Sequence, residues 1–108
     1  MKLNEYQDKA LRTHNDEMSQ TQAFSNYGLG LNGEAGEVAD ILKKGIFHGH
    51  EMNRHELAKE LGDVLWYVAN IAHLAGFTLE KIALMNVDKL MRRYPTGFDA
   101  ERSVNRVD

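Results

Sequence analysis

Two short motifs decide the fold of this 108-residue chain: GEAGE at residues 33–37 and KELGD at residues 59–63. Each motif carries two acidic residues three positions apart, so on an α-helix the two carboxylates share one face. The segment 45–53 between them is rich in glycine and polar residues, and Asn53 with Glu56 predicts a capping box that opens a second helix. An antiparallel helical hairpin would therefore bring both acid pairs to the same height, roughly 10 Å from the turn at about 1.5 Å per residue.

The two acid pairs predict a metal site. They consist of Glu34 with Glu37 and of Glu60 with Asp63. Two carboxylates about 5 Å apart repel each other by roughly 3 kcal/mol at an effective dielectric constant near 20, so either some are protonated or a cation lies among them. Oxygen ligands suit a hard ion, Mg²⁺ first with Mn²⁺ as a substitute, and the absence of His and Cys from both pairs argues against zinc. One such pair alone is more typical of a solvated helix face, whereas two at matched height favour an ion.

Composition and length fit a single domain over residues 1–108, with a core small enough to favour oligomerisation. The net charge of -3 gives no basic surface for duplex nucleic acid. The chain has no cysteine, and its polar N-terminal residues do not resemble a signal peptide. No apolar run reaches transmembrane length. These observations predict a cytoplasmic protein that does not bind membranes.

Apolar periodicity predicts an all-α, four-helix bundle. The predicted helices span residues 3–13, 24–44, 53–75 and 79–93. Asn4 and Gln7 predict a capping box for the first of them. The apolar residues of the fourth helix are expected to face inward: Ile82, Met85 and Leu90. A tail over residues 97–108 is expected to be loosely held.

Three sequence patterns point to a known family. They are EAGE followed by ELGD and a Trp-Tyr pair, the run GLNGEAGEVAD at residues 30–40, and the run NVDKLMRRYP at residues 86–95. Together they resemble the MazG type of the all-α nucleoside triphosphate pyrophosphatase superfamily. The resemblance covers residues 27–95, although the usual alanine of the second pattern is replaced by Asn32.

The resemblance implies an activity, a metal and an assembly. Members of the family hydrolyse nucleoside triphosphates between the α and β phosphates, giving a monophosphate and pyrophosphate. They form dimers and tetramers in which neighbouring subunits complete or flank the sites. The four acids that bind Mg²⁺ in the family fall on Glu34, Glu37, Glu60 and Asp63. The family's phosphate-contacting cations fall on Lys89 and Arg93, and its aromatic one turn after the last acid falls on Tyr67.

The residue chemistry is compatible with that activity. A bound Mg²⁺ offsets the charge of a triphosphate and lowers the pKa of a bound water. A carboxylate outside full coordination can accept the water's proton, and either the second pair or Glu37 is a candidate. Lys89 and Arg93 share a helix face that can stabilise the leaving pyrophosphate, although a cationic helix C-terminus is the alternative.

The remaining candidates each have a structural alternative. Asn86 lies a turn before Lys89 and either joins it or is a solvated amide. Tyr67 rather than Trp66 is expected to face the site, because neighbouring residues point about 100° apart and Tyr67 follows Asp63 at i+4. Asn70 either contacts a base or sugar or is a core amide.

The leading hypothesis is a Mg²⁺-dependent pyrophosphohydrolase that removes unwanted nucleoside or deoxynucleoside triphosphates, as a homodimer or homotetramer. A preference for dUTP or dCTP would use the same acids, and a phosphoribosyl-ATP pyrophosphatase is a more distant possibility. The alternative from another class is a non-catalytic helical interaction module with a structural cation. A di-iron bundle would require Glu-x-x-His pairs, which are absent here. A zinc site is disfavoured because the candidate ligands lack a shared helix face: His48, His50 and His55.

Overall fold

The computed structural model describes residues 1–106, and its secondary structure is helical with no β-strand in that range, which confirms the all-α prediction. Five helices follow one another: α1 (Leu3–Leu11), α2 (Gln20–Phe47), α3 (Arg54–Leu74), α4 (Leu79–Arg93) and α5 (Ala100–Val104). Within the described range, none of the helices combines the length and the apolar character that crossing a bilayer requires.

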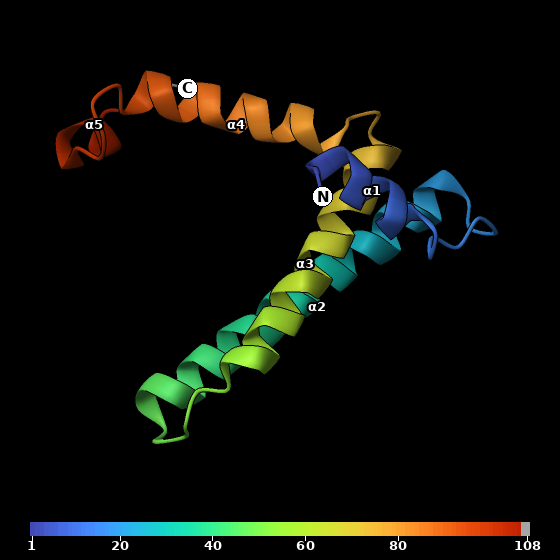
Figure 1. Ribbon diagram of the computed structural model, residues 1–108, viewed down its shortest axis with the longest axis horizontal. Coiled ribbons are helices and arrows are strands. Elements are labelled where there is room, and N and C mark those ends of the chain that lie inside the picture. Colours follow the sequence, from blue (N-terminus) through green and yellow to red (C-terminus); the bar gives the residue numbers. More distant parts are fainter. Residues whose placement is uncertain (107–108) are drawn as a thin grey trace.

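The centre of the fold is the long antiparallel hairpin of α2 and α3, which pack side by side along their lengths (Figure 1). Helix α2 begins at Gln20, earlier than predicted, because Ser19 and Gln22 form a reciprocal capping box. Asn53 caps α3 as predicted, because its side chain accepts a hydrogen bond from the Glu56 amide at 3.0 Å. The capping box is only half formed, since the Glu56 carboxylate pairs with Lys59 at 3.4 Å instead. The predicted antiparallel hairpin is confirmed, although α2 continues to Phe47, through the first three residues of the predicted turn.

Helix α1 differs from the prediction in how its polar residues are used. Its N-cap is Lys2, which makes no side-chain cap hydrogen bond, and Asn4 and Gln7 lie inside the helix. Their side-chain oxygens accept hydrogen bonds from the backbone amides of Glu80 and Leu79 instead. The predicted Asn4–Gln7 capping box is thus wrong: these side chains satisfy the free amides at the start of α4 rather than those of their own helix.

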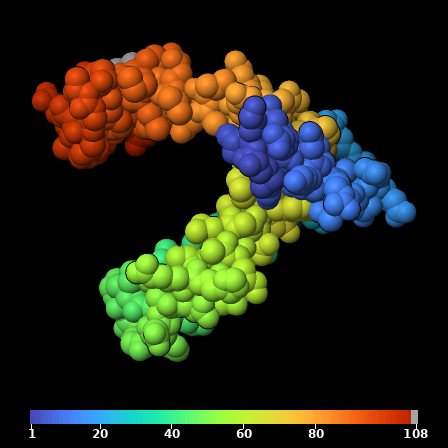
Figure 2. Space-filling view, viewed as in Figure 1, coloured from blue at the N-terminus to red at the C-terminus, as the bar shows by residue number. Residues whose placement is uncertain are grey.

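Helix α4 leaves the hairpin at an angle, so a single chain does not close into a four-helix bundle (Figures 1 and 2). Its principal packing is against α1 and α3. Ile82 is half-buried against the core, but Met85 is 50% exposed and Leu90 is 41% exposed. The expectation that these three residues all face inward is therefore wrong for the last two. The turn that redirects the chain contains Gly76 at φ +86°, a conformation that suits glycine.

The core lies at the elbow where α1, α3 and the start of α4 meet. Its buried members are small or aliphatic, and four partly buried side chains pack against them: Ala10, Ala69, Ala72 and Leu79, with Tyr6, Trp66, Val68 and Ile82. Small residues allow the three helices to approach closely at this point. The rest of the hairpin and most of α4 are covered less completely by this chain's own residues.

The segment predicted to be a loose tail contains helix α5. Asp99 caps this helix, accepting hydrogen bonds from the amides of Glu101 and Arg102. The Arg102 guanidinium donates to the carbonyl of Arg93 at 2.6 Å and to that of Arg92 at 3.1 Å, which ties α5 to the end of α4. The last two residues of the predicted tail, 107–108, lie outside the described residues.

Candidate metal and phosphate site

Three of the four predicted acids come together across the hairpin. Glu34 from α2 and Glu60 and Asp63 from α3 each offer a carboxylate oxygen, and the three oxygens lie within 4.8 Å of one another. Glu34 and Glu60 are half-buried and Asp63 is exposed. We call these three residues the acid cluster. Three oxygens from two rigid helices form a partial cage of the kind that a hard divalent ion occupies.

The environment of the acid cluster raises the pKa of one of its carboxyl groups. The pKa of Glu60 is raised, first by a hydrogen bond with Glu34, then by burial, and then by repulsion from Glu34 and Asp63. Each of these causes disfavours a further negative charge among the three carboxylates. A divalent ion held between them would offset the same repulsion, so these residues fit a metal.

Glu37 is not brought into the acid cluster. It lies three residues after Glu34, the same spacing that separates Asp63 from Glu60, so the spacing itself does not explain the difference. Its side chain is exposed. The pKa of Lys44 is raised mainly by the hydrogen bond and 2.8 Å ion pair with Asp40, and the negative charge of Glu37 raises it further. Glu37 therefore lies beside the cluster rather than within it.

Tyr67 lies in the interface between α2 and α3. A Cβ atom added at Gly30 would be 2.3 Å from Tyr67 Cε1, so the ring rests directly on the α2 backbone where glycine leaves room. The ring also contacts Tyr27 and Trp66 edge to face, with centroids 5.9 Å and 5.0 Å away. We call Tyr27, Trp66, Tyr67 and His14 the aromatic cluster. Tyr67 thus packs between the helices one turn from Asp63.

Trp66 has the packing role expected of it. Its indole Nε1 donates to the Thr13 hydroxyl at 2.8 Å, and its ring also packs against Tyr27 at 5.3 Å. In the same cluster, His14 Nδ1 lies 2.5 Å from the Tyr27 hydroxyl. These contacts fasten the segment after α1 onto the hairpin.

Asn70 is a buried amide on α3. It is 1% exposed, and its Nδ2 donates to the Trp66 carbonyl one turn earlier at 3.0 Å. Its Oδ1 is buried and accepts no hydrogen bond from the described residues. Of the two sequence interpretations, this burial favours a core amide.

The predicted phosphate-binding residues lie on α4, outside the hairpin. Asn86 and Lys89 line a groove of about 470 Å³ that runs along α4 beside Met85 and Arg92. Arg93 is half-buried at the end of the helix, where its carbonyl accepts the hydrogen bond from Arg102. Because α4 diverges from the hairpin in Figure 2, one chain does not place these cations against its own acid cluster.

Sequence reasoning missed one polar group near the acid cluster, the Tyr6 phenol of α1. Burial raises the pKa of Tyr6 most, and the negative charge of Asp63 raises it further. The phenol therefore lies within electrostatic reach of that carboxylate. In the sequence, Tyr6 belongs to the apolar stripe of its helix, and no local signal relates it to an acid 57 positions later.

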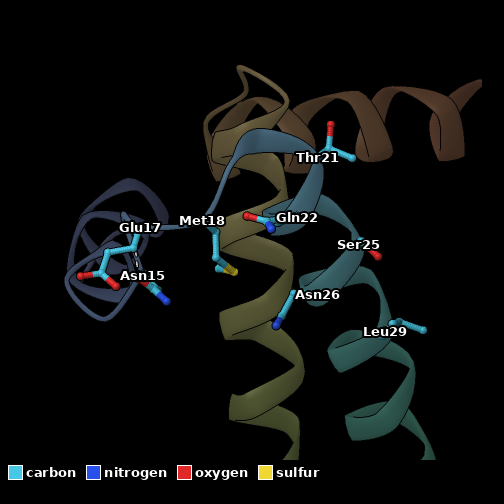
Figure 3. Close-up of a pocket in the computed structure, with 8 residues that line it drawn as sticks. All are labelled: Asn15, Glu17, Met18, Thr21, Gln22, Ser25, Asn26 and Leu29. Atoms are coloured by element: carbon cyan, nitrogen blue, oxygen red, sulfur yellow. Dashed lines mark hydrogen bonds between the residues drawn. The ribbon is translucent and has the colours of Figure 1, made fainter.

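An open depression of about 700 Å³ lies at the connection of α1 and α2 (Figure 3). Most of its lining side chains are amides and hydroxyls: Asn15, Glu17, Met18, Thr21, Gln22, Ser25, Asn26 and Leu29. Figure 3 shows the connecting segment standing away from α2, with Thr21, Ser25 and Leu29 on the outer side of that helix. None of the predicted site residues lines this depression.

Residues 22–98 match the family model of the MazG nucleotide pyrophosphohydrolase domain. The chain belongs to the MazG family. The matched range contains the acid cluster, Glu37, Tyr67 and the α4 cations, so the residues that carried the resemblance lie inside the MazG domain.

One curated relative of this MazG-family chain is the Gene 37 protein of Mycobacterium phage L5. It is 38% identical over 82 residues, which cover 70% of each chain. The name of that relative states no activity. No solved structure gives a significant match to the chain.

Proposed function

We propose that this MazG-family chain is a Mg²⁺-dependent pyrophosphohydrolase. It would cleave nucleoside or deoxynucleoside triphosphates between the α and β phosphates, release a monophosphate and pyrophosphate, and so clear unwanted nucleotides from the cytoplasmic pool. The observation that carries the proposal is the convergence of Glu34, Glu60 and Asp63 within 4.8 Å from two packed helices of a MazG domain.

The side chains of the site would have different roles in the reaction. Glu34, Glu60 and Asp63 would hold the ion, whose charge would offset the repulsion that raises the pKa of Glu60. Mg²⁺, when bound, supplies charge neutralisation and a water of lowered pKa. Glu37 stands outside the acid cluster and is uncommitted to coordination there, so it is a candidate to accept the water's proton, as is a member of the second acid pair.

We further propose that a second copy of the chain, in a homodimer or homotetramer, covers α4. Three apolar side chains of this helix are more than half exposed: Leu84 59%, Val87 57% and Met91 58%. A 15-residue helix anchored mainly by its first turns is marginal in water without tertiary packing. In such an assembly Lys89 and Arg93 would face the phosphates held at a partner's acid cluster. Their positive charges would then stabilise the negative charge of the phosphates.

The test is a screen of the natural ribo- and deoxyribonucleoside triphosphates with Mg²⁺, reading monophosphate and pyrophosphate. Asp63→Asn removes one ligand oxygen's charge, and Asp8→Asn is the control because Asp8 is an exposed acid on α1. We expect Asp63→Asn to lower the rate of pyrophosphate release by more than the roughly 10–100-fold that residues behind the metal ligands contribute. The rate of Asp8→Asn should be unchanged.

Two outcomes would contradict the proposal. Release of orthophosphate and a nucleoside diphosphate would show that another bond is cleaved. The other contrary outcome is that no triphosphate yields pyrophosphate while Asp63→Asn lowers thermal stability in Mg²⁺, which would instead support a non-catalytic module with a structural cation.

A further inference from the structure

The side chain of Gln7 joins α1 to three other parts of the molecule. It is 4% exposed, and its Nε2 donates to the carbonyl of Ala69 on α3 and to that of Phe77 in the turn, both at 3.1 Å. Its Oε1 accepts from the amide of Leu79, the first residue of α4, at 3.0 Å. A single amide thereby connects α1, α3, the α3–α4 turn and the start of α4.

Asn4, one turn earlier on the same face, extends this connection. Its Oδ1 accepts from the Glu80 amide at 3.0 Å, and its Nδ2 donates to the Glu80 carboxylate at 3.3 Å. Thr78 supplies the ordinary N-cap hydrogen bond to the Lys81 amide. Of the first three amides of α4, two are therefore bound by α1, a helix more than 70 residues away in the sequence.

We propose that Gln7 is a positioning residue that sets the direction of α4 and thereby the place of Lys89 and Arg93 in the catalytic assembly. The inference rests on the proposed function for its catalytic consequence. Lys89 and Arg93 follow Leu79 by about 15 Å and about 21 Å along the helix axis, at 1.5 Å per residue. A rotation of about 10° at the start of α4 would therefore move them by about 2.6 Å and about 3.7 Å.

Such displacements are large for catalysis, because a misplacement of about 1 Å can cost about 100-fold in rate. Few side chains can make the three hydrogen bonds that Gln7 makes. A carboxylate of the same shape accepts from the Leu79 amide but cannot donate to two carbonyls, and a leucine leaves all three backbone groups unpaired. Gln7→Glu therefore tests the hydrogen bonding with little change of volume.

The control is Gln20→Leu. Gln20 is an exposed glutamine whose Nε2 donates to the Leu74 carbonyl at 3.4 Å, so it also bridges to the end of α3, by a hydrogen bond that does not involve α4. The chain has no cysteine, so nitroxide labels can be placed at Lys43→Cys on α2 and at Asp88→Cys on α4. Asp88 is exposed and is not one of the three apolar residues that a second copy is proposed to cover. Distances within one chain are then measured by double electron–electron resonance, with the labelled protein diluted in unlabelled chain.

We expect Gln7→Glu to shift or broaden the label distance distribution by several ångströms. We also expect kcat for pyrophosphate release to fall at least tenfold, while Mn²⁺ affinity at the acid cluster, read by its own electron resonance, stays within twofold. Gln20→Leu should leave all three unchanged. Asn4→Ala, at a less buried site, should give a smaller change in the same direction and serves if Gln7→Glu fails to fold.

An unchanged distance distribution in a folded Gln7→Glu protein would overturn the inference, as would a shifted distribution with unchanged kcat. If the unsubstituted protein releases no pyrophosphate from any triphosphate, the proposed function fails separately. The distance measurement alone then decides whether Gln7 directs α4.

Discussion

Replacing Gly30 by alanine tests how closely the hairpin is packed around Tyr67. The added Cβ would lie 2.3 Å from Tyr67 Cε1, 2.4 Å from Cζ and 2.7 Å from the hydroxyl oxygen. Carbon atoms in contact are normally about 3.5–4.0 Å apart, so the ring must move by about 1 Å. Tyr27 and Trp66 both contact the ring edge to face, so moving it disrupts these contacts.

The magnitude follows from comparing two glycines of the same helix. At Gly28 an added Cβ meets no atom within 4 Å, so Gly28→Ala should gain about 0.5–1 kcal/mol of helix propensity. Gly30→Ala has the same propensity gain but must accommodate an overpacked methyl, which costs about 1–3 kcal/mol. We therefore expect Gly30→Ala to be less stable than Gly28→Ala by about 1–3 kcal/mol.

The assay is urea unfolding at one fixed protein concentration, followed by circular dichroism. Trp66 is the single tryptophan and belongs to the aromatic cluster, so its fluorescence should change in the folded Gly30→Ala protein but not in Gly28→Ala. Equal stability of the two variants, with an unaltered tryptophan spectrum, would refute the packing of Tyr67 on Gly30.

Three further outcomes are expected. In metal-free protein the raised pKa of Glu60 means that the folded state binds its proton more tightly than the unfolded state, so this stabilisation is present below the ordinary glutamate pKa. It is lost as pH rises through the raised folded value, and Glu60→Gln should flatten that part of a urea-unfolding profile measured against pH in EDTA. Tyr27→Phe, which removes the hydrogen bond to His14, should lower the free energy of unfolding by about 0.5–1.5 kcal/mol in the same denaturation assay. Arg102→Ala should speed amide hydrogen exchange in α5 and at the end of α4, because two hydrogen bonds to α4 carbonyls are lost; unchanged exchange would count against that tether.

The hairpin was predictable because its signals are local. Acid pairs at i, i+3, the glycine-containing turn and the cap at Asn53 all lie within a few residues of what they specify. The structure has the Asn53 cap where expected, and it shortens the predicted turn only by the three residues that extend α2 to Phe47. The convergence of Glu34, Glu60 and Asp63 follows from that hairpin. Glu37 has the same spacing from Glu34 as Asp63 has from Glu60, so the i, i+3 pattern alone does not predict which acids converge across the hairpin.

The wrong predictions concern residues whose contacts depend on parts of the structure that are distant in the sequence. Asn4 and Gln7 have the spacing of a capping box, but their hydrogen bonds run to residues 76 and 72 positions away. A periodic pattern also shows that α4 has an apolar side without showing what covers it. Met85 and Leu90 look like core residues in the sequence and are half exposed or nearly so in the single chain.

The central claim is that the acid cluster holds a divalent ion that serves attack of water at the α phosphorus of a nucleoside triphosphate. It is tested most directly by ³¹P nuclear magnetic resonance of the reaction run in ¹⁸O-labelled water, with Mg²⁺ and then with EDTA. We predict pyrophosphate without the label and a monophosphate carrying one ¹⁸O atom, formed in Mg²⁺ alone. Label in the phosphate that leaves, or the same products in EDTA, would contradict the account.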